Sequence, residues 1–206
     1  MTQHDRLPGF DVSRETLERL EAYDALLNKW NPAINLVSPA TLSQLWTRHF
    51  LDSAQLFDLA EGREGLWADL GSGGGFPGLV VAILAKEKRP AQRFVLVESD
   101  RRKSTFLMTV ARELGLSVEV RAQRIEEVNP LQADILSARA LAPLDRLLGF
   151  AARHLASSGL AVFPKGASWR DELAEAQKNW SFSVQTYPSL TDPEAAILTF
   201  AEVSRV

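Results

Sequence analysis

The sequence predicts an α/β fold, a doubly wound and mainly parallel sheet of about seven strands that follows two helices. From residue 66 onward, short apolar runs alternate with segments of helical periodicity, which is the βαβ pattern of a parallel sheet. The first run breaks into a loop with four glycines among residues 71–75, typical of a ligand-binding turn at a strand end. Too few residues separate the last two runs for a helical crossover, so these strands should be antiparallel.

The N-terminal part predicts helices only. Ser13 can cap a helix that runs to about Trp30, with apolar residues near one face and acids on the others. The Asn-Pro pair at 31–32 should end this helix, because the residue before a proline avoids the helical region. A second helix opens at 38–39 and spaces its apolar residues for burial as far as Phe57. We expect these helices to form a cap rather than a separate domain.

We expect a single domain over residues 1–206, with the helical cap at 1–60 and the α/β core at 61–206. The expected strands of the core are 66–70, 93–98, 117–121, 133–138, 159–163, 181–187 and 195–202. The expected helices are 77–88, 101–114, 143–156 and 168–179. Right-handed crossovers through these helices would join the parallel strands.

Composition narrows the class of protein. The chain has 206 residues, 46% of them hydrophobic, which suits one globular domain with a sizeable core. A net charge of -3 gives no overall signal for nucleic acid, so any basic surface must be local. The absence of cysteine and three scattered histidines argue against disulfides, a thiolate nucleophile and a metal site. The polar N-terminus lacks a signal-peptide pattern and no apolar run is long enough to span a membrane, so we expect a cytoplasmic protein.

Residues 66–78 predict a site for a nucleotide-type ligand. Glycines allow a sharp turn and close approach of a ligand, and the following helix start offers free N–H groups. The glycine spacing over 73–78 matches the dinucleotide fingerprint, whereas the spacing over 71–75 fits the looser loop of S-adenosyl-L-methionine (SAM) methyltransferases. Asp69 stands just before the loop, where a carboxylate would favour the cationic groups of SAM over a pyrophosphate.

The order of elements also separates the two ligand classes. A doubly wound sheet that ends in an antiparallel hairpin is expected of a Rossmann-like SAM-dependent methyltransferase, whereas dehydrogenase domains usually continue with another βαβ unit or a substrate domain. A small NAD(P)-dependent oxidoreductase stays as an alternative, although neither Tyr23 nor Tyr187 has the lysine four residues on that such enzymes use. A non-catalytic nucleotide- or RNA-binding module is another alternative.

Several polar residues follow the expected strands, where open α/β sheets bind their ligands. Glu98 ends the second strand, where an acid can bond the ribose hydroxyls of a nucleoside. Ile125 and Glu126 follow the third strand, where the chain should pass an adenine, although an acid such as Glu126 is usually an ordinary loop or helix-cap residue. Arg139 ends the fourth strand and could clamp a phosphate or carboxylate or stack on a base, with an ion pair to a nearby acid as the alternative.

Further charged residues give weaker signals. Lys165 follows the fifth strand and could meet an RNA phosphate, or it could simply be solvated. Arg101 and Lys103 start the helix after the second strand, where cations are unfavourable unless an external anion is nearby. His49 is spaced with neighbouring aromatic residues, which favours a packing role over that of a catalytic base.

Five segments carry signatures that occur together in one family. They are Asn-Lys-Trp-Asn-Pro-Ala-Ile-Asn-Leu at 28–36, Arg-His-Phe-Leu-Asp-Ser at 48–53, the glycine loop at 69–78, Ser-Ala-Arg-Ala at 137–140 and Pro-Lys-Gly at 164–166. Together they resemble the RsmG (GidB) family, bacterial guanine-N7 methyltransferases of small-subunit ribosomal RNA. The resemblance covers about residues 20–190, and the pairing of the first two segments is far more specific than the glycine loop.

The resemblance implies SAM as cofactor and 16S ribosomal RNA, or the small ribosomal subunit, as substrate. It implies SAM contacts at Gly71, Gly73, Phe76, Ile125, Glu126 and Arg139. Guanine N7 carries a lone pair and no proton, so the reaction needs orientation rather than a general base, and no catalytic residue is expected.

Two positions depart from the family pattern. Ala138 stands between Ser137 and Arg139, where the family reads Ser-Arg-Ala directly, which leaves the role of Ser137 open. The last strand usually carries an Arg-His pair before its apolar run, and Glu-Ala-Ala-Ile-Leu at 194–198 replaces it here.

Overall fold

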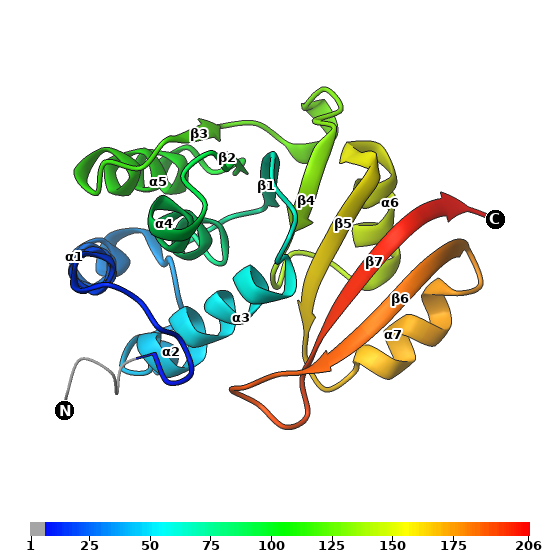
Figure 1. Ribbon diagram of the computed structural model, residues 1–206, viewed down its shortest axis with the longest axis horizontal. Helices are drawn as coiled ribbons and strands as arrows, with labels where there is room; N and C mark the ends of the chain where they lie inside the picture. Colours follow the sequence, from blue (N-terminus) through cyan, green and yellow to red (C-terminus); the bar gives the residue numbers. More distant parts are fainter. Residues whose placement is uncertain (1–6) are drawn as a thin grey trace.

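Seven strands form one mixed sheet in the computed structural model, which describes residues 7–206 (Figure 1). They are β1 (Leu66–Leu70), β2 (Arg93–Val97), β3 (Val118–Arg121), β4 (Ala133–Ser137), β5 (Leu155–Lys165), β6 (Trp180–Pro188) and β7 (Ala196–Arg205). Their order is β3-β2-β1-β4-β5-β7-β6, and β7 runs antiparallel to both neighbours. The predicted doubly wound α/β fold with an antiparallel end is confirmed. Residues 1–6, which include the polar N-terminus, lie outside the described part of the chain.

The first helix is longer than predicted. Helix α1 (Arg14–Ile34) begins after Ser13, whose side chain accepts from the N–H of Thr16 as expected. The prediction that the helix ends at 31–32 was wrong, because α1 continues through Pro32. Asn31 is buried, and its Oδ1 accepts from the N–H groups of two following residues at 2.8 and 2.9 Å. These bonds hold the helix end in place beyond the proline.

The second predicted helix is interrupted. It divides into α2 (Pro39–Leu42), a π-helical turn η2 (Leu45–Phe50) and α3 (Leu51–Leu59). The wide turn lets Trp46 donate to Asp24 of α1 at 2.8 Å, while Phe50 stacks on the ring of Tyr23. Such turns often mark functional sites, and this one carries His49 to the ring of Phe76 in the glycine loop, 4.9 Å between centroids.

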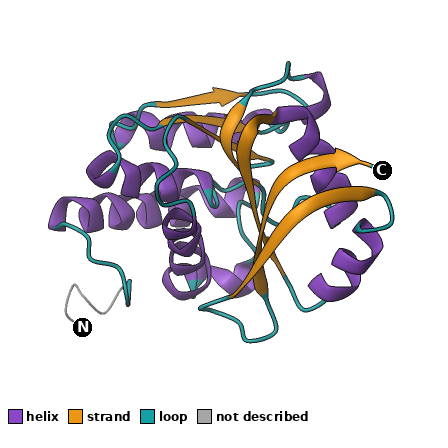
Figure 2. Cartoon of the chain, turned by 45° about the vertical axis from the view of Figure 1, so that its right-hand side comes forward, coloured by secondary structure: helices purple, strands orange, loops and turns teal. Residues whose placement is uncertain are grey.

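Helices cover both faces of the sheet (Figure 2). Helices α1, α3, α4 (Gly78–Lys88) and α5 (Arg101–Glu113) share one hydrophobic core, whereas α6 (Leu144–His154) and α7 (Trp169–Ala176) build the other. Strand residues alternate between the two cores: Leu96 faces the first, Val95 and Val97 the second. Among the predicted boundaries, the helix expected at 143–156 ends earlier because Leu155 already pairs with β4.

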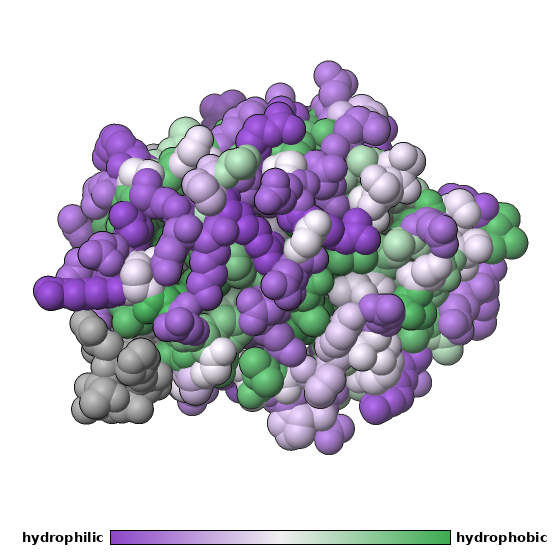
Figure 3. All heavy atoms as spheres, in the orientation of Figure 1, coloured by the Kyte–Doolittle hydropathy of each residue, from purple (hydrophilic) through white to green (hydrophobic). Residues whose placement is uncertain are grey.

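The surface is mostly polar. On the face shown in Figure 3, hydrophilic side chains cover most of the molecule and hydrophobic residues form small separate areas. No helix in the described part of the chain is long and apolar enough to cross a lipid bilayer. Within residues 7–206, no group of three or more His, Asp or Glu side chains could hold a metal ion.

Candidate functional site

A cavity of about 550 Å³ opens at the carboxyl ends of β1, β2 and β4. In the sheet, β2 and β3 lie on one side of β1, and β4 lies on its other side. The strand order therefore reverses between β1 and β4, and open α/β sheets bind ligands at such a switch point. The cavity wall contains all seven residues that the sequence predicts to bind the cofactor: Gly71, Gly73, Phe76, Glu98, Ile125, Glu126 and Arg139. The fold therefore brings four separate chain segments together around one space.

Two glycines of the loop serve different purposes. Both have positive φ, +66° at Gly71 and +54° at Gly73. A Cβ on Gly71 would lie 2.5 Å from Leu141 Cδ1, so this glycine lets the protein pack on itself. A Cβ on Gly73 would meet nothing closer than a backbone oxygen at 3.8 Å. The missing side chain of Gly73 therefore leaves free space in the wall that a ligand could occupy.

Asp69 lies beneath the glycine loop and does not line the cavity. The expectation that its carboxylate faces a cationic ligand was wrong, because Asp69 pairs in register with Ser137 of β4 and is fully buried there. It accepts from Ser137 Oγ at 2.7 Å and from the N–H of Gly78 at 3.3 Å. Ser137 Oγ also accepts from Trp67 Nε1 at 2.9 Å. Asp69 of β1 thus joins β4, through Ser137, to the start of α4, through Gly78, under the cavity floor.

The buried carboxylate predicts an unusual dependence of stability on pH. Burial raises the pKa of Asp69 from 3.8 to about 6, although hydrogen bonds from Ser137, Ser72 and Gly78 oppose the shift. The folded chain therefore holds this proton more tightly than the unfolded chain, and the contribution of Asp69 to stability falls as pH rises from about 4 to about 6. Relative to wild type, Asp69→Asn should gain up to about 3 kcal/mol across this window.

Denaturant unfolding of both proteins at several pH values between 4 and 7 measures this difference. Glu172 and Glu87 have lowered pKa values and act in the opposite direction, but they are common to both proteins and cancel in the comparison. A stability difference that stays constant with pH would contradict the assignment.

Glu98 holds the glycine loop and faces the cavity. The residue is 9% exposed; Oε2 accepts from the N–H of Gly73 and Oε1 from the N–H of Asp100, both at 2.8 Å. A carboxylate has about four acceptor positions, so Glu98 can still accept from ligand hydroxyls. Asp100 caps α5 by accepting from the N–H groups of Arg102 and Lys103. The basic residues at the start of α5 suggested a nearby anion, and the carboxylate of Asp100 is an anion at that position.

The turn after β3 forms an apolar part of the wall. Ile125 and Glu126 lie in a 3-10 turn, η3 (Ile125–Glu127). Ile125 is 8% exposed and packs in the second core while still lining the cavity. The carboxylate of Glu126 accepts from Arg146 Nη2 at 2.6 Å. Glu126 therefore offers its main chain to the cavity more readily than its acid.

Arg139 is held between an aromatic ring and a carboxylate. Its side chain is 17% exposed, and its guanidinium carbon lies 5.0 Å from the centre of the Phe76 ring. Nη1 lies 3.7 Å from Oδ2 of Asp52 in α3. Asp52 was not predicted as the partner, because only the folded N-terminal helices bring it to β4. One signal for this pair was present in the sequence: Asp52 and Arg139 both lie in segments that resemble the family's motifs, at 48–53 and 137–140.

His49 joins this group from the π turn. Its ring stacks on Phe76, and both ring nitrogens are buried with no hydrogen-bond partner among the described residues. Burial, with Arg139 and Arg48 nearby, lowers the pKa of His49 to about 3. The imidazole is therefore neutral and weakly basic, and the expected packing against aromatic residues is confirmed.

A second, smaller cavity of about 290 Å³ adjoins the first and shares His49, Arg139 and Ala140 with it. It lies at the ends of β4 and β5, beside the loop 189–195 between β6 and β7. Lys165, for which the sequence left open a contact with an RNA phosphate or a solvated side chain, has a side chain that is 10% exposed and lies 2.6 Å from Glu172 Oε2. Its charge is thus neutralised inside the protein.

The segment 194–198, which departs from the family pattern, lies at this second cavity. Ala195 and Ala196, within the segment that replaces the Arg-His pair, line its wall. Two small side chains at these positions leave the cavity open where larger cationic or aromatic groups would fill it.

Comparison with known proteins gives matches along most of the chain. The family model GidB, rRNA small subunit methyltransferase G, matches residues 16–198. A protein named ribosomal RNA small subunit methyltransferase G from Ruegeria pomeroyi is 56% identical over 196 residues, covering 95% of this chain and 96% of the relative. A protein of the same name from Cereibacter sphaeroides is 52% identical over 206 residues and covers all of both chains.

Solved structures show the same fold at low sequence identity. A TehB-like SAM-dependent methyltransferase from Corynebacterium glutamicum has a TM-score of 0.57 at 15% identity, covering 88% of this chain and 98% of the other. The CurJ carbon methyltransferase has a TM-score of 0.61 at 13% identity, covering 92% and 67%. The predicted Rossmann-like methyltransferase fold is therefore confirmed.

Proposed function

Because this chain belongs to the GidB family of rRNA small subunit methyltransferase G proteins, we propose that it transfers a methyl group from S-adenosyl-L-methionine to N7 of a guanine in 16S ribosomal RNA. The observation that carries the proposal is the cavity at the switch point, in whose wall all seven predicted cofactor-binding residues meet. The full coverage of relatives that bear the same name supports the choice of RNA as substrate.

The cavity residues fit SAM. Glu98 has acceptor capacity for ribose hydroxyls, and Ile125 gives an apolar wall of the kind that an adenine packs against. The open space at Gly73 suits the amino acid part, and Arg139 can pair with its carboxylate. SAM supplies, when bound, an electrophilic methyl group on a positively charged sulfur.

The chain's own contribution to the reaction is orientation. The N7 lone pair forms the new N–C bond as the S–C bond breaks, and the positive charge passes from sulfur to the base. No proton moves, so no general base is needed, and the low basicity of His49 agrees with this. Rigid placement of the reacting groups then supplies the rate enhancement. The rings of Phe76 and His49 and the guanidinium of Arg139 provide such a rigid wall.

We also infer that residues 1–60 and 61–206 work as one domain in the cytoplasm, where small ribosomal subunits are assembled. Helix α3 contributes Asp52 to the wall beside Arg139. Gln55 of the same helix donates to the carbonyl of Pro188 at 2.7 Å and accepts from the N–H of Leu190 at 3.0 Å. The helical cap thus contacts the ligand-binding edge of the sheet after β4 and again at the end of β6.

The choice of cofactor is tested by thermal stability. SAM and its demethylated product should raise the melting temperature, because a ligand that binds only the folded state stabilises it by about 2.7 kcal/mol at one hundred times its dissociation constant. NAD should leave the melting temperature unchanged. Stabilisation by NAD and not by SAM would support the oxidoreductase alternative instead.

The reaction is tested by mapping N7-methylguanine in ribosomal RNA from cells with and without this protein. We expect one modified guanine to disappear from small-subunit RNA without it, and the purified protein with SAM to restore it. Binding of SAM without methyl transfer to naked RNA or to small subunits would favour the non-catalytic binding module.

A further inference from the structure

The second cavity lies where a methyl acceptor would have to enter. It shares the wall formed by His49, Arg139 and Ala140 with the first cavity, and both open at the same edge of the sheet. Its volume of about 290 Å³ is close to the lower limit of about 300 Å³ for small-molecule pockets. It therefore has room for a single base.

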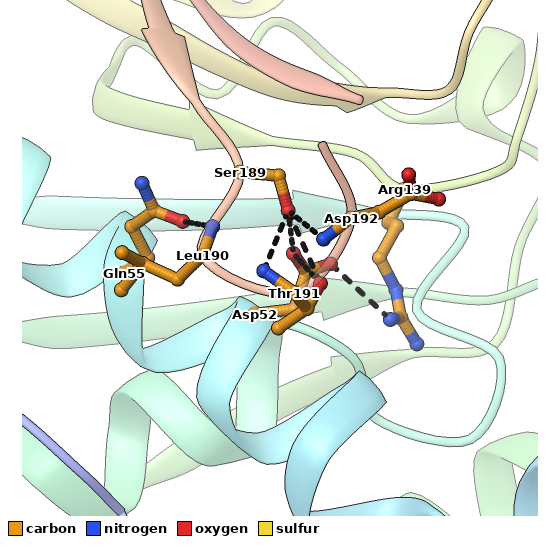
Figure 4. Close-up of polar contacts among 7 residues, drawn as sticks. All are labelled: Asp52, Gln55, Arg139, Ser189, Leu190, Thr191 and Asp192. Atoms are coloured by element: carbon orange, nitrogen blue, oxygen red, sulfur yellow. Dashed lines mark hydrogen bonds and ion pairs between the residues drawn. The ribbon is translucent and has the colours of Figure 1, made fainter. Parts of the chain in front are cut away.

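The loop 189–195 forms the far wall and is fixed to the helical cap (Figure 4). The hydroxyls of Ser189 and Thr191 lie 3.3 and 3.2 Å from Asp52 Oδ1, to which both donate. Oδ2 of the same carboxylate lies 3.7 Å from Arg139 Nη1. One residue of α3 thus holds both the far wall and the arginine at the junction, so the cavity is preformed.

One carboxylate of this cavity has no cationic partner. Two of its three acids, Asp52 and Glu172, lie against cations of the same wall. Asp192 makes no ion pair within residues 7–206, and its Oδ1 accepts only from the N–H of Glu194, at 3.0 Å. Because a carboxylate has about four acceptor positions, Asp192 can accept further donors from a ligand.

Polar groups on the opposite side of the cavity also lack hydrogen-bond partners within residues 7–206. At the junction, the two ring nitrogens of His49 are buried without a hydrogen-bond partner among the described residues. These nitrogens are shielded from solvent, so the donors that a ligand meets at the junction are the N–H groups of the Arg139 guanidinium beside the His49 ring. The cavity thus presents donors beside the first cavity and an acceptor pair in the outer loop.

Guanine matches this arrangement. Its N7 and O6 acceptors lie side by side on one edge, while N1–H and the N2 amino group are adjacent donors on the Watson–Crick edge. Enzymes that act on a base extracted from its stack read that edge by hydrogen bonds. We propose, on the basis of the function proposed above, that the second cavity receives the target guanine with its N7 edge toward His49 and Arg139, and that Asp192 selects guanine by accepting from N1–H and N2–H.

The test changes one partner on each side of the Asp192 contact. The substrate is small-subunit ribosomal RNA assembled by splinted ligation with guanine or inosine at the mapped position, offered as naked RNA and in reconstituted subunits. Inosine lacks the N2 amino group and keeps N7. Single-turnover methylation is measured for wild type, Asp192→Asn and the control Glu194→Gln, which changes an exposed acid of the same loop outside the cavity. Calorimetry gives the SAM affinity of each protein.

Inosine should slow wild type and Glu194→Gln by at least about tenfold, because the carboxylate then loses a charge-assisted hydrogen bond. Asp192→Asn should be slow on guanine by a similar factor, should not distinguish the two bases, and should bind SAM normally. Equal inosine effects in all three proteins, wild-type rates in Asp192→Asn, or loss of its SAM binding would overturn the proposal. A wild-type protein that methylates neither RNA would instead overturn the proposed function.

Discussion

Replacing Gly73 with valine is expected to give a folded protein that no longer binds SAM. The cavity side of Gly73 is open, since a Cβ there meets nothing closer than 3.8 Å, so added methyl groups would enter the space left for the ligand. We expect the dissociation constant of SAM to rise by at least about 100-fold, on the order of 2.7 kcal/mol of binding free energy. Calorimetry on the folded variant measures it.

Backbone strain needs its own control, because φ at Gly73 is +54° and a β-branched residue is unfavourable there. Gly62 is a matched position: φ is +75°, an added Cβ would have no heavy atom within 4 Å, and the residue is exposed outside the cavity. Gly62→Val should lose comparable stability and keep SAM affinity. If Gly73→Val binds SAM as well as Gly62→Val does, the glycine loop is not the cofactor site.

The alternation of strands and helices was predictable because it depends on local sequence features, namely apolar periodicity and the positions of glycine and proline. The meeting of the candidate residues was predictable for a related reason. Glu98 and Arg139 follow parallel strands of one sheet, and the carboxyl ends of such strands share an edge. Knowing which residues follow strands was enough to place them around one cavity.

Tertiary contacts explain what the sequence did not reveal. The π turn exists because Trp46 and Phe50 pack on α1, a contact that no local pattern encodes. Asp69 looked like a ligand-facing acid, but its register with Ser137 buries it between two strands. Lys165 looked free, but a carboxylate of α7 neutralises it. In each case a long-range partner, and not the residue type, determined the role.

Arg139 is the position where we expect the largest loss of activity with an intact fold. Its guanidinium lies over Phe76, next to Asp52, in the wall between the two cavities. A lysine keeps the charge but loses the planar group with its five donors. Arg139→Lys and Arg139→Ala should therefore both lower single-turnover methyl transfer by tenfold or more, about 1.4 kcal/mol of transition-state stabilisation.

Arg89 provides the matched control, since it is also partly buried over a phenylalanine ring. Its guanidinium lies 3.9 Å from the centre of Phe57 and donates to two main-chain carbonyls, outside both cavities. Arg89→Lys should lower the melting temperature and leave methyl transfer per folded molecule unchanged, because this arginine only joins helices. If Arg139→Lys behaves in the same way, Arg139 serves the fold through its pair with Asp52 and not the reaction. Melting temperature and single-turnover rate, measured side by side for the two lysine variants, separate these roles.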